Sequence, residues 1–511
     1  MKSAAIIFPH QLFRPHPILA APRESPSRIF VVEDALFFGD EHHPVSFHKQ
    51  KLWLHRATMR RYAQTLKDDG HRVTYIEYAK TRRGLEDVFD RAARDRCKRL
   101  CTTDPHDYLI SRRLDRLSRQ HGIEVESVAT PMFINTPEDN TSYRDGKKRW
   151  YMADFYQHQR RRLDILMNGD DPVGDRWSFD EDNRKSVPKS MLGSIPNLPD
   201  LNAELSGDKF GGEAKRYVDK HFAEHPGSLD RLYYPISHEA ASEWLDRFLA
   251  ERFERFGDYE DAIVHGESWL WHAVLTPMLN IGLLTPEQVV ERSLEYANTH
   301  DVPINSTEGF VRQVIGWREF IRATYDDLGV PMRRKNHWNH TRKIPRSFWT
   351  GDTGIDPIDD AIVRVRQTGY LHHIERLMVM GGFMFLCEFD PDEIYKWFME
   401  MFIDSYDWVM VPNAYAMSQN ADGGNITTKP YFSGSAYVRR MSNHRRGEWC
   451  DIWDGLYWRY IWTRRETLSK NHRWAMMCRS VEKMDRTKLD THLKNAEQFL
   501  ASLDDAEKYF A

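Results

Sequence analysis

The sequence predicts a two-part fold: an N-terminal α/β domain, and an all-helical domain joined to it by a long connector. Short apolar stretches alternate with amphipathic ones up to residue 130, whereas helical periodicity dominates from His238 onward. Between them, clusters of Pro, Gly, Asp and Asn interrupt any pattern. Because 511 residues suffice for two or three domains, we assign 1–130 to the α/β domain, 131–230 to the connector and 231–511 to the helical domain.

Five apolar stretches rich in β-branched residues are expected to be strands of the first domain: Ala4–Phe8, Arg28–Val32, Arg72–Tyr78, Arg99–Thr102 and Glu124–Val128. Helices are expected over Phe47–Asp69 and Arg83–Arg96. This alternation predicts a mostly parallel, doubly wound, Rossmann-like sheet. No G-x-G-x-x-G motif follows the first strand, which disfavours a dinucleotide dehydrogenase. Pro9-His10-Gln11-Leu12 ends that strand instead, at the edge where such sheets bind ligands.

The connector contains one amphipathic stretch, Trp150–Met167, while Lys209–Lys220 and Gly227–Leu229 are expected to be exposed loop ends. No apolar run approaches the length of a membrane span, and the first residues lead directly into a strand. A cytoplasmic, monomeric protein is therefore expected. The net charge of -4 means that any binding of nucleic acid must use a local patch.

The stretch from Tyr370 to Gly424 has the pattern of a buried helical core and also carries the polar residues expected in the wall of a cavity. His372 and Arg376 lie one helical turn apart on an apolar pattern, and Asp404 could neutralise Arg376 at low exposure. Val411-Pro412-Asn413 is expected to break the helix. Two histidines on an apolar helix are most often satisfied core residues. Their spacing to Arg376, Asp404 and Asn413 favours a ligand cavity instead.

These motifs resemble the flavin-binding domain of the photolyase and cryptochrome family, over nearly the whole chain. The similarity is greatest to its bacterial branch of deoxyribodipyrimidine photolyase-related proteins, which includes prokaryotic (6-4) photolyases. His48-Lys49-Gln50-Lys51 and Gly174–Arg184 resemble signatures of that branch. Leu371-His372-His373 resembles the (6-4) form, because photolyases that repair cyclobutane dimers usually carry Leu-His-Asn there.

The resemblance implies FAD as the cofactor. Trp271–Gly282 is similar to the family's L-S-P-Y-L-x-x-G stretch, in which Thr276 and backbone N–H groups at a helix start would bind the flavin pyrophosphate. Glu308–Phe320 is similar to a second flavin motif but contains one extra residue, Gly316, so the helix phase of Gln313 stays open. The implied cofactor-binding residues are His272, Thr276, Asn280, Gln313, Trp317, Arg376, Asp404 and Asn413.

The resemblance also implies roles in DNA repair. His373 would give a proton to the lesion and His372 would position it, because reversing a (6-4) bond needs a proton. Asp261, Tyr431 and Arg318 match positions near the lesion. Two basic stretches, Arg333–Lys343 with an interleaved Trp338 and Arg439–Arg446, suit DNA phosphates. From them we select Arg334, Lys335 and Arg440. Trp397 and Trp349 match the branch's electron path, although Phe398 stands where a relative has tyrosine.

Relatives in the bacterial branch contain two further groups, an antenna chromophore and an iron-sulfur cluster. In the bacterial branch the sheet crevice can hold an antenna chromophore, 6,7-dimethyl-8-ribityllumazine, but relatives commonly carry Gly-Asp-Gln-Leu at Pro9–Leu12, so an occupied and an empty crevice both stay open. Many relatives hold a four-cysteine iron-sulfur cluster. Here Pro357 occupies the region of the first ligand, and Met441–Cys450 lacks the paired cysteines. No cluster and no other metal are expected.

The leading hypothesis is light-dependent repair of UV-induced (6-4) photoproducts in DNA. A cryptochrome-like photoreceptor is the second hypothesis, although Asp485–Tyr509 reads as a final amphipathic helix with no long extension after it. A cyclobutane pyrimidine dimer photolyase is the third, because it would share every motif except Leu371-His372-His373.

Overall fold

The computed structural model describes residues 2–20, 26–79, 84–199 and 208–504. Near the N-terminus, five parallel strands form one sheet in the order β3-β2-β1-β4-β5. The strands are β1 (Ser3–Ile7), β2 (Ile29–Val32), β3 (Val73–Ile76), β4 (Arg99–Thr103) and β5 (Glu124–Val128). This is the predicted doubly wound sheet, and each strand lies within two residues of its expected bounds.

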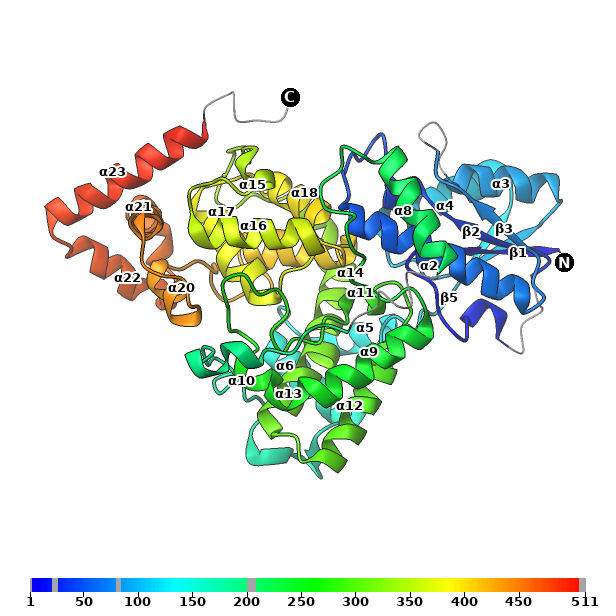
Figure 1. The fold of residues 1–511 in the computed structure, drawn as a ribbon, viewed down its shortest axis with the longest axis horizontal. Coiled ribbons are helices and arrows are strands. Elements are labelled where there is room, and N and C mark those ends of the chain that lie inside the picture. Colours follow the sequence, from blue (N-terminus) through cyan, green and yellow to red (C-terminus); the bar gives the residue numbers. More distant parts are fainter. Residues whose placement is uncertain (1, 21–25, 80–83, 200–207, 505–511) are drawn as a thin grey trace.

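Helices cover both faces of the sheet. Figure 1 shows α2 (Lys49–Asp68) and α8 (Lys209–His221) on one side, and α3 (Gly84–Arg94) and α4 (Tyr108–His121) on the other. Residues of β1 and β2 are consequently buried almost without exception, which explains why these strands are apolar at successive positions. The helices expected over Phe47–Asp69 and Arg83–Arg96 are confirmed as α2 and α3, with Arg83 itself outside the described residues.

The expectation that Lys209–Lys220 is an exposed loop end was wrong. The segment is helix α8, which Asp208 caps by accepting hydrogen bonds from the N–H groups of Phe210 and Gly211. Its small and apolar residues Gly211, Ala214 and Val218 recur at helical spacing and are buried. Gly227 is also not exposed: a Cβ there would lie 2.3 Å from the His48 ring. Part of the predicted connector therefore packs on the sheet domain.

The rest of the connector lies among the helices of the helical domain, with α5 and α6 near α9 and α13 in Figure 1. It contains α5 (Pro137–Arg144), α6 (Met152–Leu163) and a short hairpin of β6 (Met167–Asn168) and β7 (Asp171–Pro172). The amphipathic stretch Trp150–Met167 forms helix α6 over most of its length. Residues 200–207 of the connector lie outside the described residues.

The second half of the chain is helical, as predicted, and lies beside the sheet domain, with α21–α23 at the end remote from it (Figure 1). Its helices are α9 (His238–Glu251), α10 (Phe253–Tyr259), α11 (Thr276–Leu279), α12 (Pro286–His300), α13 (Ile304–Val311), α14 (Glu319–Arg333), α15 (Ser347–Thr350), α16 (Asp356–Thr368), α17 (Gly382–Leu386), α18 (Pro391–Met401), α19 (Asp407–Met410), α20 (Ser435–Met441), α21 (Glu448–Leu468), α22 (His472–Glu482) and α23 (Arg486–Leu503). Minor elements elsewhere are α1 (Ala35–Phe38) and the 3-10 turns η1 (Pro17–Leu19), η2 (Val173–Asp175) and η3 (Lys189–Ser194).

Helix α23 accounts for the predicted final helix, of which residues 505–509 fall outside the described part of the chain. Within the described ranges, no helix is both long enough and apolar enough to cross a lipid bilayer.

Three π-helical segments interrupt the helical domain: η4 (Arg312–Arg318), η5 (Glu375–Gly381) and η6 (Val411–Ser418). The predicted helix break at Val411-Pro412-Asn413 was wrong, because α19 continues directly into η6. A proline ring and its missing N–H would disrupt an α-helix, but the wider π-turn accommodates Pro412. Helix geometry of this kind is rare and is frequently found at functional sites.

Candidate functional site

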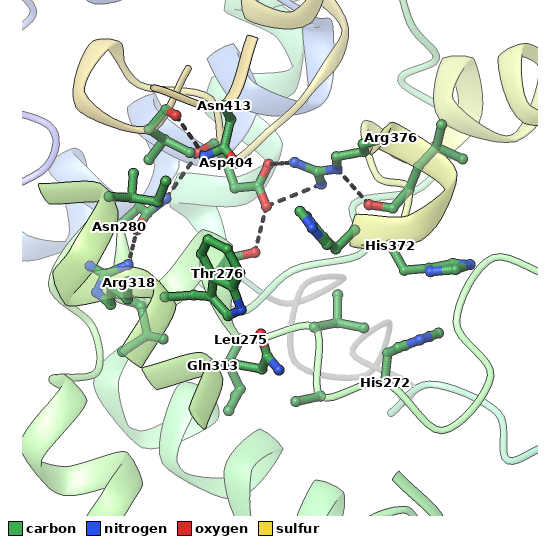
Figure 2. Close-up of a pocket in the computed structure, with 18 of the residues that line it drawn as sticks. His272, Leu275, Thr276, Asn280, Gln313, Arg318, His372, Arg376, Asp404 and Asn413 are labelled. Carbon is green, nitrogen blue, oxygen red and sulfur yellow. Dashed lines mark hydrogen bonds and ion pairs between the residues drawn. The ribbon is translucent and has the colours of Figure 1, made fainter. Parts of the chain in front are cut away.

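A cavity of about 300 Å³ lies in the middle of the helical domain. Residues of α11 and of all three π-helical segments line it, so the unusual helix geometry is concentrated at its wall. Figure 2 shows polar side chains from these elements converging on one side of the cavity. Much of the remaining wall is apolar, including Leu275, Val314 and Met417. This combination is typical of a pocket for an organic ligand.

The expected ion pair between Arg376 and Asp404 is confirmed. The Arg376 guanidinium approaches both Asp404 carboxylate oxygens, at 2.8 and 3.1 Å, and its Nε donates to the Leu371 carbonyl oxygen at 2.6 Å. The Thr276 hydroxyl donates a third hydrogen bond to Asp404, at 2.5 Å. Asp404 is buried. Its carboxylate thus joins α11 to η5, two elements that lie about a hundred residues apart in the chain.

Asn280 extends this network to η4. Its amide nitrogen donates to the backbone oxygen of Asp404 at 2.9 Å, and its amide oxygen accepts from Arg318 at 2.6 Å (Figure 2). Arg318, which was predicted near the substrate, lines the same cavity as the predicted cofactor residues. Burial lowers the pKa of its guanidinium to about 10. We therefore group Arg318 with Asn280 rather than with the surface cations.

The extra residue Gly316 lies inside the π-helical segment η4, which resolves the question of helix phase. One added residue widens a single turn, so the residues on both sides can keep their faces. Gln313 and Trp317 accordingly both line the cavity. A Cβ at position 316 would lie 2.9 Å from the terminal methyl of Met152 and 3.1 Å from the Tyr156 ring, so α6 packs closely against η4 here.

The histidines lie at one edge of the cavity. His372 precedes the helix and His373 opens it, which corrects the expectation that His372 shares a helix with Arg376. The rings of His372 and His272 stack with centroids 4.4 Å apart (Figure 2). His373 is open to the cavity but surrounded by protein, and burial, assisted by the charges of Arg376 and Arg312, lowers its pKa to about 4.

Glu260 is a cavity residue that the sequence analysis missed. Its carboxylate accepts a hydrogen bond of 2.5 Å from Gln313, and burial raises its pKa to about 8. The neighbouring Asp261, whose pKa is raised to about 6 by burial, is not among the residues that line the cavity. Asp261 and Tyr431 both lie within electrostatic reach of Asp180 and Arg184, which groups these two predicted residues together.

The remaining cofactor candidate, Asn413, is held at the cavity wall by its position in η6. Its amide nitrogen donates to the Val409 backbone oxygen at 2.8 Å, and both residues line the cavity. All eight predicted cofactor residues therefore gather around one space.

Comparison with known proteins identifies the family to which this chain belongs. A model of the family described as deoxyribodipyrimidine photo-lyase-related protein matches residues 5–234. Over 473 residues the chain is 31% identical to a (6-4) photolyase of Agrobacterium fabrum, and the alignment covers 89% of this chain and 92% of that relative. The chain belongs to the deoxyribodipyrimidine photolyase-related family.

Solved structures agree on the fold of this photolyase-related protein. A bacterial class III photolyase from Agrobacterium tumefaciens matches with a TM-score of 0.57 at 14% identity, covering 98% of this chain and 96% of that one. A cryptochrome from Synechocystis matches with a TM-score of 0.58 at 13% identity, covering 96% and 94%. Both similarities show the shared architecture and no more.

The surface cations of the photolyase-related chain only partly match the predicted basic patches. Arg334, Lys335 and Arg440 are exposed. Trp338, expected to be interleaved with the first patch as a stacking surface, is buried and donates from its indole N–H to Asn420 at 3.3 Å. In the same stretch Arg333 pairs with Asp407. The first patch therefore offers charge but not the predicted aromatic.

The predicted electron path is only partly connected to the cavity. Phe398 lines the cavity, and Trp397 lies behind it, fully buried, with ring centroids 5.6 Å apart. The Trp397 indole N–H donates to the Phe348 backbone oxygen, and that of Trp349 to Glu400. The aromatic ring nearest the cavity on this route is thus a phenylalanine, which is not readily oxidised.

Aromatic and polar side chains pack against one another at the carboxyl edge of the sheet, where the antenna chromophore of the bacterial branch was expected. The His10 ring lies 4.9 Å from Phe37 and 6.0 Å from Tyr406, and a His55 ring nitrogen contacts the Tyr406 hydroxyl at 2.7 Å. The amide of Gln11 bridges the crevice to the Thr103 backbone oxygen at 2.9 Å. An antenna chromophore at this crevice stays a prediction.

The five cysteines are dispersed: Cys101, Cys450 and Cys478 lie on β4, α21 and α22, whereas Cys97 precedes β4 and Cys387 follows α17. Cys97, Cys387, Cys450 and Cys478 are buried, Cys101 is partly buried, and all five are free thiols. Among the residues that the structure describes, no group of three or more His, Cys, Asp or Glu side chains is placed to hold a metal ion.

Proposed function

We propose that this protein is a light-dependent (6-4) photolyase that uses FAD to repair pyrimidine-pyrimidone (6-4) photoproducts in UV-damaged DNA. The observation that carries the proposal is the cavity itself, where the Arg376–Asp404 pair and His373 face one space. The similar protein of Agrobacterium fabrum named (6-4) photolyase, with which the alignment extends over most of both chains, supports the same substrate.

The cavity fits a flavin chemically. The Trp408 indole N–H and Nδ1 of His372 are buried without a hydrogen-bond partner within the described part of the chain, and both residues line the cavity. A bound polar ring system would satisfy such groups. Asn280, Arg376, Asp404 and Asn413 would hold the flavin, and Thr276 opens the helix proposed to bind its pyrophosphate. When bound, FAD supplies the light-driven electron.

The side chains of the protein have separate tasks in this scheme. Asp404 keeps Arg376 neutralised and oriented at the cavity wall. The exposed Arg334, Lys335 and Arg440 would contact DNA phosphates. These contacts would hold the duplex while the lesion is turned out of it into the cavity. His373 holds the proton that the lesion receives, and His372 positions it. Trp397 and Trp349 are proposed to carry electrons inward.

As purified, the protein is expected to be yellow and to contain FAD in near-stoichiometric amount. Thermal release followed by chromatography would measure the flavin in solution against the protein concentration. A folded protein that contains no flavin, with the circular dichroism of a largely helical chain, would contradict this assignment of the cavity.

Iron is expected to be absent, because a four-iron cluster needs about four thiolates and the five cysteines are dispersed along the chain as free thiols. Metal analysis of protein prepared without oxygen tests this directly. About four iron atoms per chain, with the visible absorption of a cluster, would overturn the proposal.

A further inference from the structure

A chain of buried charges connects the cavity to the surface behind His372. At its centre, the Arg364 guanidinium forms a bidentate contact with Glu375 and also contacts an Asp360 carboxylate oxygen at 3.0 Å. Arg364 and Glu375 are 4% and 2% exposed, and the Asp360 side chain is 7% exposed. Helix α16 supplies Asp360 and Arg364, while Glu375 opens η5.

A histidine side chain lies at each end of the triad formed by Asp360, Arg364 and Glu375. At the cavity end, Nε2 of His372 lies 3.3 Å from a Glu375 carboxylate oxygen. At the other end, ring nitrogens of His444 and His265 each lie 3.7 Å from Asp360, and their two rings contact edge to face. The His265 side chain is 63% exposed, whereas that of His444 is 4% exposed. The chain of contacts thus reaches solvent.

The charges of the triad do not cancel. Two carboxylates and one guanidinium leave one negative charge in a buried site, and burial of an uncompensated charge is unfavourable. Burial accordingly raises the pKa of Glu375. One proton would compensate the triad, and it can be bound at Glu375, at His372 or at the surface histidines.

We propose that Asp360, Arg364 and Glu375 form a charge relay that couples the protonation of His372 at the cavity to that of His444 and His265 at the surface. The inference rests on the proposed function for its purpose, because His372 adjoins the proposed proton donor His373. Arg364 stays protonated throughout, so the relay transmits charge and not a proton along its length.

At the cavity end Nε2 of His372 lies 3.3 Å from Glu375 without a hydrogen bond, so a proton can move between them once the ring turns into hydrogen-bonding geometry. Transfer from the Glu375 carboxyl to His372 breaks one O–H bond and forms one N–H bond, and the resulting carboxylate stays paired with Arg364. His272 stacks on His372, and two adjacent imidazolium rings would repel each other. Only one of these two histidines can therefore be protonated at a time. Besides Glu375 and His272, the charged groups that face His372 are Arg364, His373 and Arg376.

At the surface end, a proton on His444 or His265 compensates the negative charge of Asp360. The triad then stabilises a proton on His372 less strongly. The groups that face His444 are Asp360, His265, Arg364 and Asp356. His265 is exposed and its ring contacts His444, which belongs to the basic stretch 439–446 proposed to contact DNA, so a phosphate bound there would pair with a proton on His265. The triad would then favour a proton on His372 when DNA is bound.

The coupling can be measured in the dark, without DNA, on protein labelled with carbon-13 at the histidine ring Cε1. The His372 signal, identified by its loss in His372→Gln, is followed by NMR as the pH is lowered. We expect a second inflection in this signal at the pH where the surface histidines take up their proton. It should disappear in the double variant His265→Gln/His444→Gln, and persist in the control His300→Gln, which changes an exposed histidine elsewhere.

Glu375→Gln should also abolish the second inflection and weaken proton binding by His372 about tenfold, one pKa unit. If that variant does not fold, the double variant, whose changes lie outside the cavity, still decides the question. A His372 signal without a second inflection in the unaltered protein, or one that persists in the double variant, would refute the relay. Coupling without (6-4) repair would instead refute the proposed function and leave the relay standing.

Discussion

His373→Ala is expected to lower light-driven repair of a (6-4) lesion by about two orders of magnitude or more, the range that general acid catalysis supplies. Flavin content and lesion binding should be nearly unchanged, because neither needs the proton. The pKa of His373 is lowered to about 4, so the protonated donor is a small fraction at neutral pH. Repair per absorbed photon should therefore rise as the pH falls toward that value, and this rise should be lost in His373→Ala.

The assay uses oligonucleotides that carry one defined lesion, under blue light. His300→Ala, which removes an exposed histidine on another helix, serves as a matched control, and His372→Ala should give a smaller loss than His373→Ala. Unaltered (6-4) repair by His373→Ala would rule out its assigned role. Repair of a cyclobutane dimer but not of the (6-4) lesion would favour the dimer photolyase hypothesis, and activity on neither would favour a photoreceptor.

Asp404→Ala is expected to abolish flavin retention and to lower the free energy of unfolding by roughly 3 kcal/mol or more. The substitution leaves the guanidinium of Arg376 buried without its counter-charge, and such a loss is strongly destabilising. It also removes the acceptor of the Thr276 hydroxyl hydrogen bond. Chemical denaturation and quantification of bound flavin would measure the two effects.

Asp404→Asn provides the matched control. It keeps an acceptor for Thr276 but removes the charge, so it should lose flavin while losing less stability than the alanine variant. If Asp404→Ala retained flavin with an unchanged denaturation midpoint, the ion pair would have no role in either property.

The sequence allowed the Arg376–Asp404 pair to be predicted because each residue sits in a local pattern that makes burial evident. Glu375 belongs to the same helix start, but its partner Arg364 lies across a loop, on α16, and no spacing rule connects the two. Helix α8 was missed for a different reason. Its two consecutive glycines argue against a helix locally, and only packing against α2 overrides that preference.

The π-helical segments were beyond prediction from local pattern. Gly316 could be recognised as an extra residue and Pro412 as a helix breaker, but each signal has several structural outcomes. Whether a chain breaks, kinks or widens one turn depends on what packs around it, here Met152 of α6 at Gly316.

The widened turn at Gly316 has a consequence for protein engineering and for aligning distant homologues. Because the widened turn absorbs one residue, deleting Gly316 would return η4 to α-helical winding and leave the residues on both sides on the same faces. Gln313 and Trp317 would then still both line the cavity, with one residue fewer between them. A chimaera or alignment that places this one-residue gap outside η4 would instead pair the residues between the gap and η4 with the wrong counterparts. The position of the gap therefore decides which cavity residues of distant homologues correspond.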